Sequence, residues 1–235
     1  MPNVTRYILF GHSKGGANVR LLAARMLKSG VYAEDIILRT FGCPRCGDNA
    51  LKALLCEIED QTNYWNDGDP VPSVPRIILP LFPYTEMPRT LINSQMQPGD
   101  VWPGKPSWVR PHWGKLYERG AMPGDQWMMQ NINDFYKIDA EASVKITMET
   151  AKYWGWDGYQ NFANAMRIAW KRKDDRTVLI CSPGTEDLMD GLLDVDAAMI
   201  APPVLGGVRV HAGFWQGIEE AWQTISTEPT KETKK

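Results

Sequence analysis

A serine bracketed by glycines, placed between a predicted strand and a predicted helix, constrains this chain more than any other feature. Residues 11–15, Gly-His-Ser-Lys-Gly, follow the pattern Gly-x-Ser-x-Gly. Residues 5–10 before the pattern are typical of a strand, and residues 17–27 after it have an amphipathic helical repeat. Glycines on both sides of a serine let strand and helix approach closely and hold the serine on a sharp turn. The pattern therefore predicts a nucleophile elbow centred on Ser13.

Two other structures place glycines around a serine. A phosphate-binding loop needs a lysine immediately before the serine or threonine, after a longer glycine loop. Here Ser13 comes before Lys14, so the order excludes that loop. A glycine turn with an idle serine is the remaining alternative. The following helix favours the nucleophile, because its N-terminal N–H groups stabilise a developing negative charge.

Strands and helices continue to alternate after the serine. Residues 35–41 and 61–65 are predicted strands, and a short predicted helix at residues 50–56 lies between them. Such alternation within about 30 residues is typical of a βαβ unit, and hence of a parallel sheet with both faces covered. The fold class is therefore α/β, with a central, mostly parallel sheet.

The rest of the chain has a different texture. Prolines recur between residues 70 and 111, which predicts a long irregular segment. Residues 142–171 have an aromatic face at helical spacing and are predicted to form the longest helix. The other expected elements are helices at 128–136 and 214–225, and strands at 176–181 and 207–210.

Composition limits the class of protein. The chain has 235 residues, 43% of them hydrophobic, and a formal net charge of −2. These values predict one globular domain over residues 1–235, with a flexible tail at residues 229–235. The near-neutral charge argues against a nucleic-acid partner, and no apolar run is long enough for a transmembrane helix. No signal-peptide pattern is visible at the start, so the default expectation is a soluble protein of the cytoplasm.

A nucleophilic serine needs a base and an acid that orients the base. The chain has three histidines, and His12 is adjacent to Ser13, so its side chain is expected to leave on the opposite side. His112 and His211 remain as candidate bases. Asp69 follows the third predicted strand, where loops leave the carboxyl edge of a parallel sheet. Asp69 with His112 gives the chain order Ser, Asp, His, which is typical of α/β-hydrolases.

The elbow and three later segments form a recognisable set. They are Gly-His-Ser-Lys-Gly-Gly-Ala at 11–17, Thr-Phe-Gly-Cys-Pro-Arg-Cys-Gly-Asp at 40–48, Asp-Pro-Val-Pro at 69–72 and His-Trp-Gly at 112–114. In this order they resemble the class 3 lipases, the fungal-lipase-like α/β-hydrolases. The resemblance implies that Ser13, Asp69 and His112 form a catalytic triad in an α/β-hydrolase fold.

Two further family motifs are present, but in an unusual order. Residues 178–185 resemble the strand and turn that supply an oxyanion donor, and residues 210–214 resemble the family's Val-His-x-Gly-Phe segment. Both precede the elbow in the family, whereas here they follow it. The resemblance therefore covers nearly the whole chain only if the chain is circularly permuted. Residues 1–138 would then correspond to the family's C-terminal part, and residues 139–228 to its N-terminal part.

The position of the nucleophile strand supports such a permutation independently. That strand belongs in the middle of its sheet, yet only a few residues precede it. Strands on one side of it must therefore come from later in the chain. The predicted strands at 176–181 and 207–210 are the candidates. Permutation is tolerated when the original termini lie close together.

The resemblance also implies roles around the serine. The backbone N–H groups of Thr185 and Lys14 correspond to the two donors of the oxyanion hole. His211 falls on a structural histidine of the family, which assigns the base to His112. The implied reaction is hydrolysis of acylglycerols or simpler esters, without a cofactor.

Substrate contacts are predicted in two segments. Leu188 and Leu192 fall at the position of the family's lid, where they would cover the site or meet a lipid surface; a solvated acidic helix is the alternative. Trp102 and Trp108 lie near His112 in the sequence. They are predicted to line an acyl pocket, or else to brace the loop.

Several alternatives remain. A phospholipase A1 belongs to the same class of enzyme, and a non-catalytic hydrolase-fold binding protein is the alternative outside it, because Lys14 and Pro183 depart from the family pattern. Cys43 and Cys46 form a Cys-x-x-Cys motif, for which packing is the main interpretation and thiol-redox chemistry a distant alternative. The aspartates between residues 187 and 196 lack EF-hand spacing, so no metal site is predicted.

Overall fold

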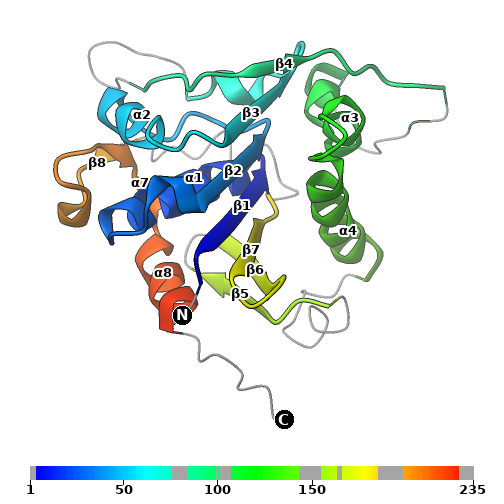
Figure 1. Ribbon diagram of the computed structural model, residues 1–235. Helices are drawn as coiled ribbons and strands as arrows, with labels where there is room; N and C mark the ends of the chain where they lie inside the picture. Colours follow the sequence, from blue (N-terminus) through cyan, green and yellow to red (C-terminus); the bar gives the residue numbers. More distant parts are fainter. Residues whose placement is uncertain are drawn as a thin grey trace, which may run out of the picture.

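A seven-stranded sheet with helices on both faces forms the centre of the molecule (Figure 1). The computed structural model describes residues 4–75, 84–98, 100, 107–142, 155–162, 166–184 and 198–227. The strands follow the order β4-β3-β2-β1-β7-β6-β5 across the sheet. Their bounds are β1 Arg6–His12, β2 Ile36–Phe41, β3 Gln61–Asn66, β4 Thr90–Ile92, β5 Gly158–Phe162, β6 Met166–Arg172 and β7 Thr177–Ser182.

Most neighbouring strands run parallel. β1 pairs in parallel with β2 on one side and with β7 on the other. β2 with β3 and β3 with β4 are also parallel, whereas β6 runs antiparallel to both of its neighbours, β5 and β7. The prediction of an α/β fold with a mostly parallel sheet is confirmed. The strand predicted at 176–181 is β7, and it takes the place beside β1 that the sequence argument required.

Helices cover both faces of this sheet. Figure 1 shows α1 and α8 on one face, and α3 and α4 on the other. The helices are α1 Lys14–Lys28, α2 Asn49–Leu55, α3 Gly114–Gly120, α4 Gln126–Ala142, α7 Ala212–Trp215 and α8 Ile218–Thr227. Short 3-10 turns occur at η1 Ala33–Asp35, η2 Val71–Ser73, η3 Ser107–His112 and η4 Pro203–Leu205.

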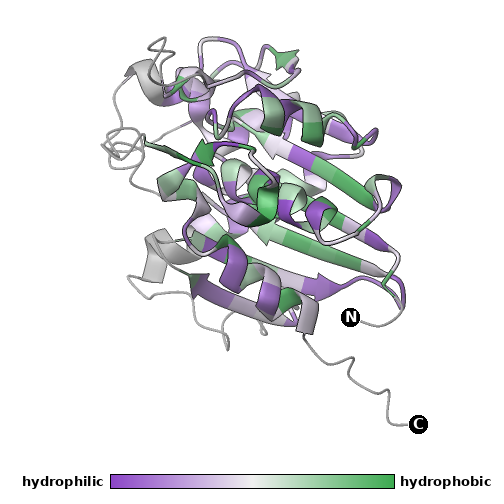
Figure 2. Cartoon of the chain, turned by 90° about the vertical axis from the view of Figure 1, so that its left-hand side faces the viewer, coloured by the Kyte–Doolittle hydropathy of each residue, from purple (hydrophilic) through white to green (hydrophobic). Residues whose placement is uncertain are grey.

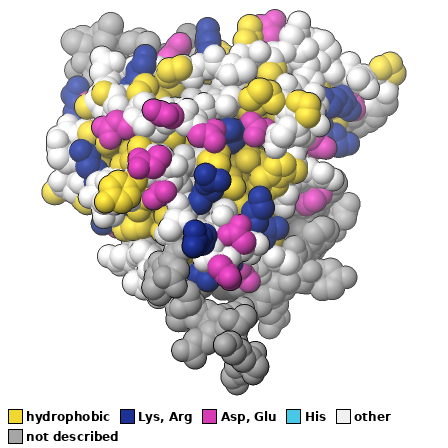
Figure 3. Space-filling view, viewed as in Figure 1, with side chains coloured by type: hydrophobic (Ala, Val, Ile, Leu, Met, Phe, Trp, Pro, Cys, Tyr) yellow, Lys and Arg dark blue, Asp and Glu magenta, His cyan; other side chains and the backbone are white. Residues whose placement is uncertain are grey.

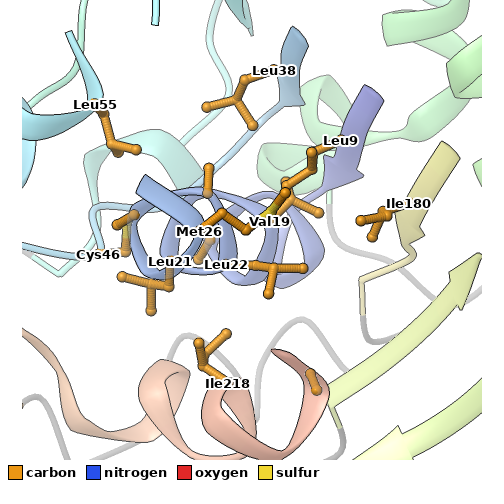
Figure 4. Close-up of a cluster of buried hydrophobic side chains, with 14 of the residues drawn as sticks. Leu9, Val19, Leu21, Leu22, Met26, Leu38, Cys46, Leu55, Ile180 and Ile218 are labelled. Atoms are coloured by element: carbon orange, nitrogen blue, oxygen red, sulfur yellow. The ribbon is translucent and has the colours of Figure 1, made fainter. Parts of the chain in front are cut away.

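Each face of the sheet has its own hydrophobic core. Alternate residues of a strand point to opposite faces, so Leu9 packs under α1 while Ile8 and Phe10 pack toward α4. The α1 side also holds side chains of α2 and α8 (Figure 4). The central strands are mainly hydrophobic in Figure 2, whereas the helices have both hydrophobic and hydrophilic sides. On the face drawn in Figure 3, acidic and basic side chains lie interspersed.

The helix predicted over residues 142–171 is wrong. Helix α4 ends at Ala142, and the described residues after it form β5 and β6. The aromatic residues of this region suit a strand as well as a helix, so their spacing did not discriminate. In the structure Gly158 pairs opposite Trp170, and a Cβ on Gly158 would lie 2.1 Å from the Trp170 ring. The pairing of β5 with β6 therefore needs a glycine at this position.

The strand predicted at 207–210 does not join the main sheet. β8 Met199–Ile200 and β9 Val210–His211 form a separate antiparallel pair. The backbone of β9 instead contacts the loop after β2, where His211 N–H donates to the Cys46 carbonyl oxygen at 3.0 Å.

Candidate active site

The turn between β1 and α1 has the geometry of an elbow. Ser13 has φ 56° and ψ −131°, and no other described non-glycine residue has a positive φ. A Cβ on Gly11 would lie 2.3 Å from the Gly15 carbonyl oxygen, and a Cβ on Gly15 would lie 1.9 Å from the Ser182 carbonyl oxygen. Only glycine therefore allows β1, α1 and β7 to meet here. The backbone conformation of Ser13 costs about 1–3 kcal/mol of folding free energy, which the surrounding hydrogen bonds must offset.

Two backbone hydrogen bonds hold the strained serine in place. Ser13 N–H donates to the Phe41 carbonyl oxygen at 2.9 Å, at the end of β2. The Ser13 carbonyl oxygen accepts from Gly16 N–H at 2.9 Å, within the first turn of α1. The serine side chain therefore lies at the carboxyl edge of the parallel strands, where ligands bind in α/β folds.

The predicted acid and base form a buried pair. His112 Nδ1 lies 2.7 Å from Asp69 Oδ2, and both residues are almost fully buried. Asp69 Oδ1 accepts a hydrogen bond from Val71 N–H at 2.8 Å, which fixes the carboxylate. The two residues come from the loop after β3 and from the end of η3, so tertiary folding alone brings them together. The predicted pairing of Asp69 with His112 is present in the structure.

Tyr117 on α3 completes the surroundings of the carboxylate. Its hydroxyl donates to Asp69 Oδ2 and accepts from Asn66 N–H at 3.0 Å. Burial and the nearby Asp69 raise the pKa of Tyr117, so the phenol keeps its proton and remains a donor. Asp69 therefore accepts from Tyr117, Val71 and His112, which places the His112 proton on Nδ1.

The tautomer leaves the second ring nitrogen of His112 as an acceptor. Nε2 is buried and has no hydrogen-bond partner among the described residues. A buried, unpartnered nitrogen is costly in a structural histidine, whereas a general base needs a free lone pair within reach of the proton that it takes. The structure shows no hydrogen bond between Nε2 and the Ser13 hydroxyl. The His112 ring also stacks on the His12 ring, with 4.5 Å between centroids and 27° between planes.

His12 is a buried neighbour of the base. Its Nε2–H donates to the His112 carbonyl oxygen at 2.9 Å, and its Nδ1 lies 2.9 Å from the Tyr136 hydroxyl. Burial, with a smaller contribution from His112, keeps the pKa of His12 well below its usual range. His12 is therefore neutral, accepts from Tyr136 at Nδ1, and orients the backbone of His112. The prediction that its role is hydrogen bonding and packing is confirmed.

Tyr136 on α4 links this histidine to the end of β7. Its hydroxyl accepts from Gly184 N–H at 2.9 Å while it faces His12. A Cβ on Gly184 would lie 2.8 Å from the Ser13 Cβ and 2.6 Å from the Tyr136 hydroxyl. The turn after β7 therefore lies directly beside the nucleophile candidate. Sequence reasoning missed Tyr136 and the role of Tyr117, because a lone tyrosine on a helix carries no signal of its partners.

His211 has structural contacts on the α1 side of the sheet. It caps α7, where its Nδ1 accepts from Phe214 N–H at 3.4 Å, and its ring stacks on Phe214 with 4.2 Å between centroids. A further ring contact joins it to Tyr84. These contacts agree with the structural role that the resemblance implied.

Other predicted site residues are placed only in part. Lys14 is the first residue of α1, directly after Ser13 in the chain, and it is buried. Trp108 is in η3, but its side chain is not described. Four other predicted positions lie outside the described residues: Thr185, Leu188, Leu192 and Trp102. The aspartates between residues 187 and 196 lie outside them as well.

Comparison with known proteins supports the family resemblance over part of the chain. Residues 2–78 match the model of the lipase (class 3) family. The matched segment contains the elbow at Ser13, the segment after β2 and the loop with Asp69, and it ends before His112. Searches of curated proteins and of solved structures found no match. The resemblance is confirmed over these residues, and the mostly parallel sheet is consistent with an α/β-hydrolase fold.

Proposed function

We propose that this chain cleaves carboxylic esters with a Ser13–His112–Asp69 triad. The match of residues 2–78 to the class 3 lipases indicates a hydrolase of the lipase and esterase type. The observation that carries the proposal is the buried His112–Asp69 pair at 2.7 Å, next to a strained serine turn. A histidine held by one carboxylate at Nδ1, with Nε2 unpartnered among the described residues, has the arrangement of a general base.

The proposed reaction is acyl transfer through Ser13. His112 Nε2 takes the proton of Ser13 as its hydroxyl attacks the ester carbonyl carbon. Asp69 stabilises the imidazolium that forms and keeps the proton of Nδ1 in place. His112 then gives its proton to the leaving alcohol, and an acyl group remains on Ser13. Water activated by the same histidine releases the acid.

The negative charge of the tetrahedral intermediate needs donors near Ser13. We assign this role to the backbone N–H groups of Lys14 and Thr185. The proximity of Gly184 to Ser13 supports the assignment, because Thr185 is the next residue in the chain. Each donor of this kind contributes about 3 kcal/mol to transition-state stabilisation.

The proposed substrates are acylglycerols or simpler esters, with phospholipids as a variant. Leu188, Leu192, Trp102 and Trp108 are the residues we assign to acyl contacts and to contact with a lipid interface. In the described part of the chain, no helix has the length and apolar character needed to cross a membrane. Dependence of the rate on acyl length and on emulsified substrate separates a lipase from an esterase.

Replacement of the serine tests the proposal. Ser13→Ala is expected to lower kcat for a short-chain p-nitrophenyl ester by about a thousandfold or more, because the nucleophile is lost. Ser29→Ala, at an exposed serine at the end of α1, is the matched control and should keep full activity. Retained hydrolysis in Ser13→Ala would place the chemistry elsewhere. A parent protein without activity on any ester would favour a non-catalytic binding protein.

Two histidine variants test the base. His112→Ala is expected to lower kcat about as much as Ser13→Ala, because the triad acts as a unit. His211→Ala removes the cap and ring packing of α7, so its main effect is expected on the free energy of unfolding. Comparable kcat values for His112→Ala and the parent would overturn the assignment.

We also propose that the chain is a circular permutant of the class 3 lipase arrangement. The parallel pairing of β1 with β7 supports this, because a strand from the second half flanks the nucleophile strand. The start of β1 and the helix α8 lie near each other in Figures 1 and 2. One domain over residues 1–235 follows from the same proposal.

A further inference from the structure

The turn after β7 is held from two sides by side chains that the proposed reaction does not use. Gly184 is the last residue of this turn that the structure describes. A Cβ on it would lie 2.8 Å from the Ser13 Cβ and 2.8 Å from the His12 carbonyl oxygen, so the turn packs directly on the elbow. Both polar groups of the Gly184 backbone are hydrogen-bonded, the N–H to a side chain of α4 and the carbonyl oxygen to a side chain of β6.

On the α4 side, the Tyr136 hydroxyl joins the turn to the base. It accepts from Gly184 N–H at 2.9 Å, and it donates to His12 Nδ1 at 2.9 Å. The other ring nitrogen of His12 donates to the His112 carbonyl oxygen at 2.9 Å. Three hydrogen bonds therefore run without a gap from the turn to the backbone of the proposed base.

On the β6 side, Arg167 binds the other half of the turn. Its half-buried guanidinium donates through Nη2 to the Gly184 carbonyl oxygen. The backbone of Arg167 is fixed in turn, because its carbonyl oxygen accepts from Ser182 Oγ at 2.7 Å. Ser182 Oγ also accepts from Asn18 Nδ2 on α1 at 3.3 Å. These contacts tie β6, β7 and the elbow helix together beside the turn.

The Gly184 carbonyl matters because of the peptide group to which it belongs. The N–H in the same peptide group is the one that we assign to the oxyanion hole. A peptide group is planar and almost always trans, so a bond that fixes the oxygen also fixes the direction of the N–H. A cationic donor on the oxygen also polarises the group, which makes the N–H a stronger donor. A donor fixed in advance needs no reorientation when negative charge develops.

We propose that Tyr136 and Arg167 are positioning residues, which hold the Gly184 peptide against Ser13 for acyl transfer. Both act through the backbone of the turn, and neither is assigned a contact with the substrate. The two hydrogen bonds on Gly184 and its close approach to the elbow carry the proposal. It rests on the proposed function, because it concerns the oxyanion donor of that reaction.

The kinetic signature of such a residue differs from that of a packing residue or a substrate contact. A fixed oxyanion donor acts on the transition state, so its misalignment lowers kcat and leaves KM nearly unchanged. Loss of a substrate contact raises KM instead. Loss of packing alone lowers the stability of the fold and leaves both constants of the folded enzyme unchanged.

Removal of one hydroxyl tests the α4 side. Tyr136→Phe keeps the ring that packs on the cluster under α4 and removes the link between Gly184 and His12. We expect kcat for a short-chain p-nitrophenyl ester to fall by about tenfold or more at nearly constant KM. Tyr159→Phe is the matched control, since its ring lies in the same cluster and its hydroxyl bonds to Asn161. It should keep the parent kcat, and its urea midpoint should be similar to that of Tyr136→Phe.

Two substitutions test the β6 side. Arg167→Met keeps the aliphatic part of the side chain and removes the donor, so kcat is expected to fall by about tenfold at nearly constant KM. Arg167→Lys keeps a cationic donor for a single carbonyl oxygen and should recover most of that loss. Arg172→Met, at the other end of β6, is the matched control and should keep the parent kcat. Equal losses in Arg167→Met and Arg167→Lys would overturn the role of the donor.

Binding of a short alkylboronic acid gives a second measure, because it forms a tetrahedral anion on a nucleophilic serine. Its affinity for Tyr136→Phe and Arg167→Met should fall by the same factor as kcat/KM. Parent kcat in both variants, or a loss that appears in KM alone, would overturn the positioning role while leaving the Ser13-dependent hydrolysis intact. A parent protein that hydrolyses no ester and binds no boronic acid would instead overturn the proposed function, and this proposal with it.

Discussion

At the scale of single residues, Gly42 determines where the base and the acid can lie. Its φ of 56° and its distances to His112 and Asp69 leave no space for a side chain. Glycine follows β2 here because the backbone itself forms one wall of the pair. The sequence contains this glycine within the Thr-Phe-Gly segment. Only the folded position of His112 shows why the residue must be glycine.

We predict that Gly42→Ala lowers kcat by about a hundredfold, because the new Cβ displaces the His112–Asp69 pair. Alanine at this positive φ also lowers the free energy of unfolding by about 1–2 kcal/mol. Gly30→Ala is the matched control, since Gly30 has φ 89° and open space around it. That variant should lose stability alone. Ester kinetics and urea unfolding of both variants measure the two effects, and equal kcat values would contradict the steric argument.

His12 makes the stability of the fold depend on pH. Its pKa is lowered in the folded protein, so the unfolded chain binds the proton first as the pH falls. The contribution of neutral His12 is complete above the ordinary histidine pKa of about 6.5, and it decreases as the pH falls below that value. Protonation would place a positive charge in a fully buried position beside the His112 ring.

We predict that the free energy of unfolding falls between about pH 7.5 and pH 5, and that His12→Gln reduces this dependence. Glutamine keeps a donor and an acceptor but does not titrate in this range. Urea unfolding of both proteins at several pH values measures the difference. An identical pH dependence in the variant would show that other groups determine it.

At the scale of elements, the early part of the chain was predictable and the later part was not. Local sequence patterns predict four elements correctly, because glycines and apolar runs mark where they end: β1, α1, β2 and β3. β5 and β6 were predicted as helix, since Trp156, Tyr159 and Trp170 suit either period. The pair of Asp69 and His112 was predicted from motif order, whereas Tyr117 and Tyr136 act through helix positions that no local pattern specifies.

Helix α2 shows how one side chain starts an element. The Asp48 carboxylate accepts from Ala50 N–H at 3.0 Å and from Leu51 N–H at 3.1 Å, and it also pairs with the half-exposed Arg209 at 3.3 Å. The cap satisfies N–H groups that the helix itself cannot, while the exposed ion pair contributes little.

We predict that Asp48→Ala lowers the free energy of unfolding by about 1 kcal/mol, whereas Asp48→Asn stays near the parent value. Asparagine keeps the cap and loses only the charge opposite Arg209. Urea unfolding compares the two variants. A similar loss in both would mean that the ion pair, and not the cap, determines the effect.

At the scale of the whole molecule, the two halves of the chain share one sheet. Val4, two residues before β1, packs against the same core as Ile225 near the end of α8. Joining the ends by a flexible linker is therefore compatible with the fold.

We predict that a permuted chain, which begins at residue 143, directly after α4, and links residue 235 to residue 1, folds with the same secondary structure and keeps kcat within about tenfold of the parent. Circular dichroism and ester kinetics measure this. An unfolded product would contradict the proposed permutation, and an unpermuted chain with the same linker at its C-terminus controls for the added residues.

The central place of β1 has a consequence for synthesis on the ribosome. Arg6 and Tyr7 pair on one side with Thr177 and Val178, which are translated about 170 residues later. Until then one edge of that strand stays open, and open edges of apolar strands are prone to pair wrongly. The residue proposed to perform the chemistry is thus made long before the strand that completes its turn.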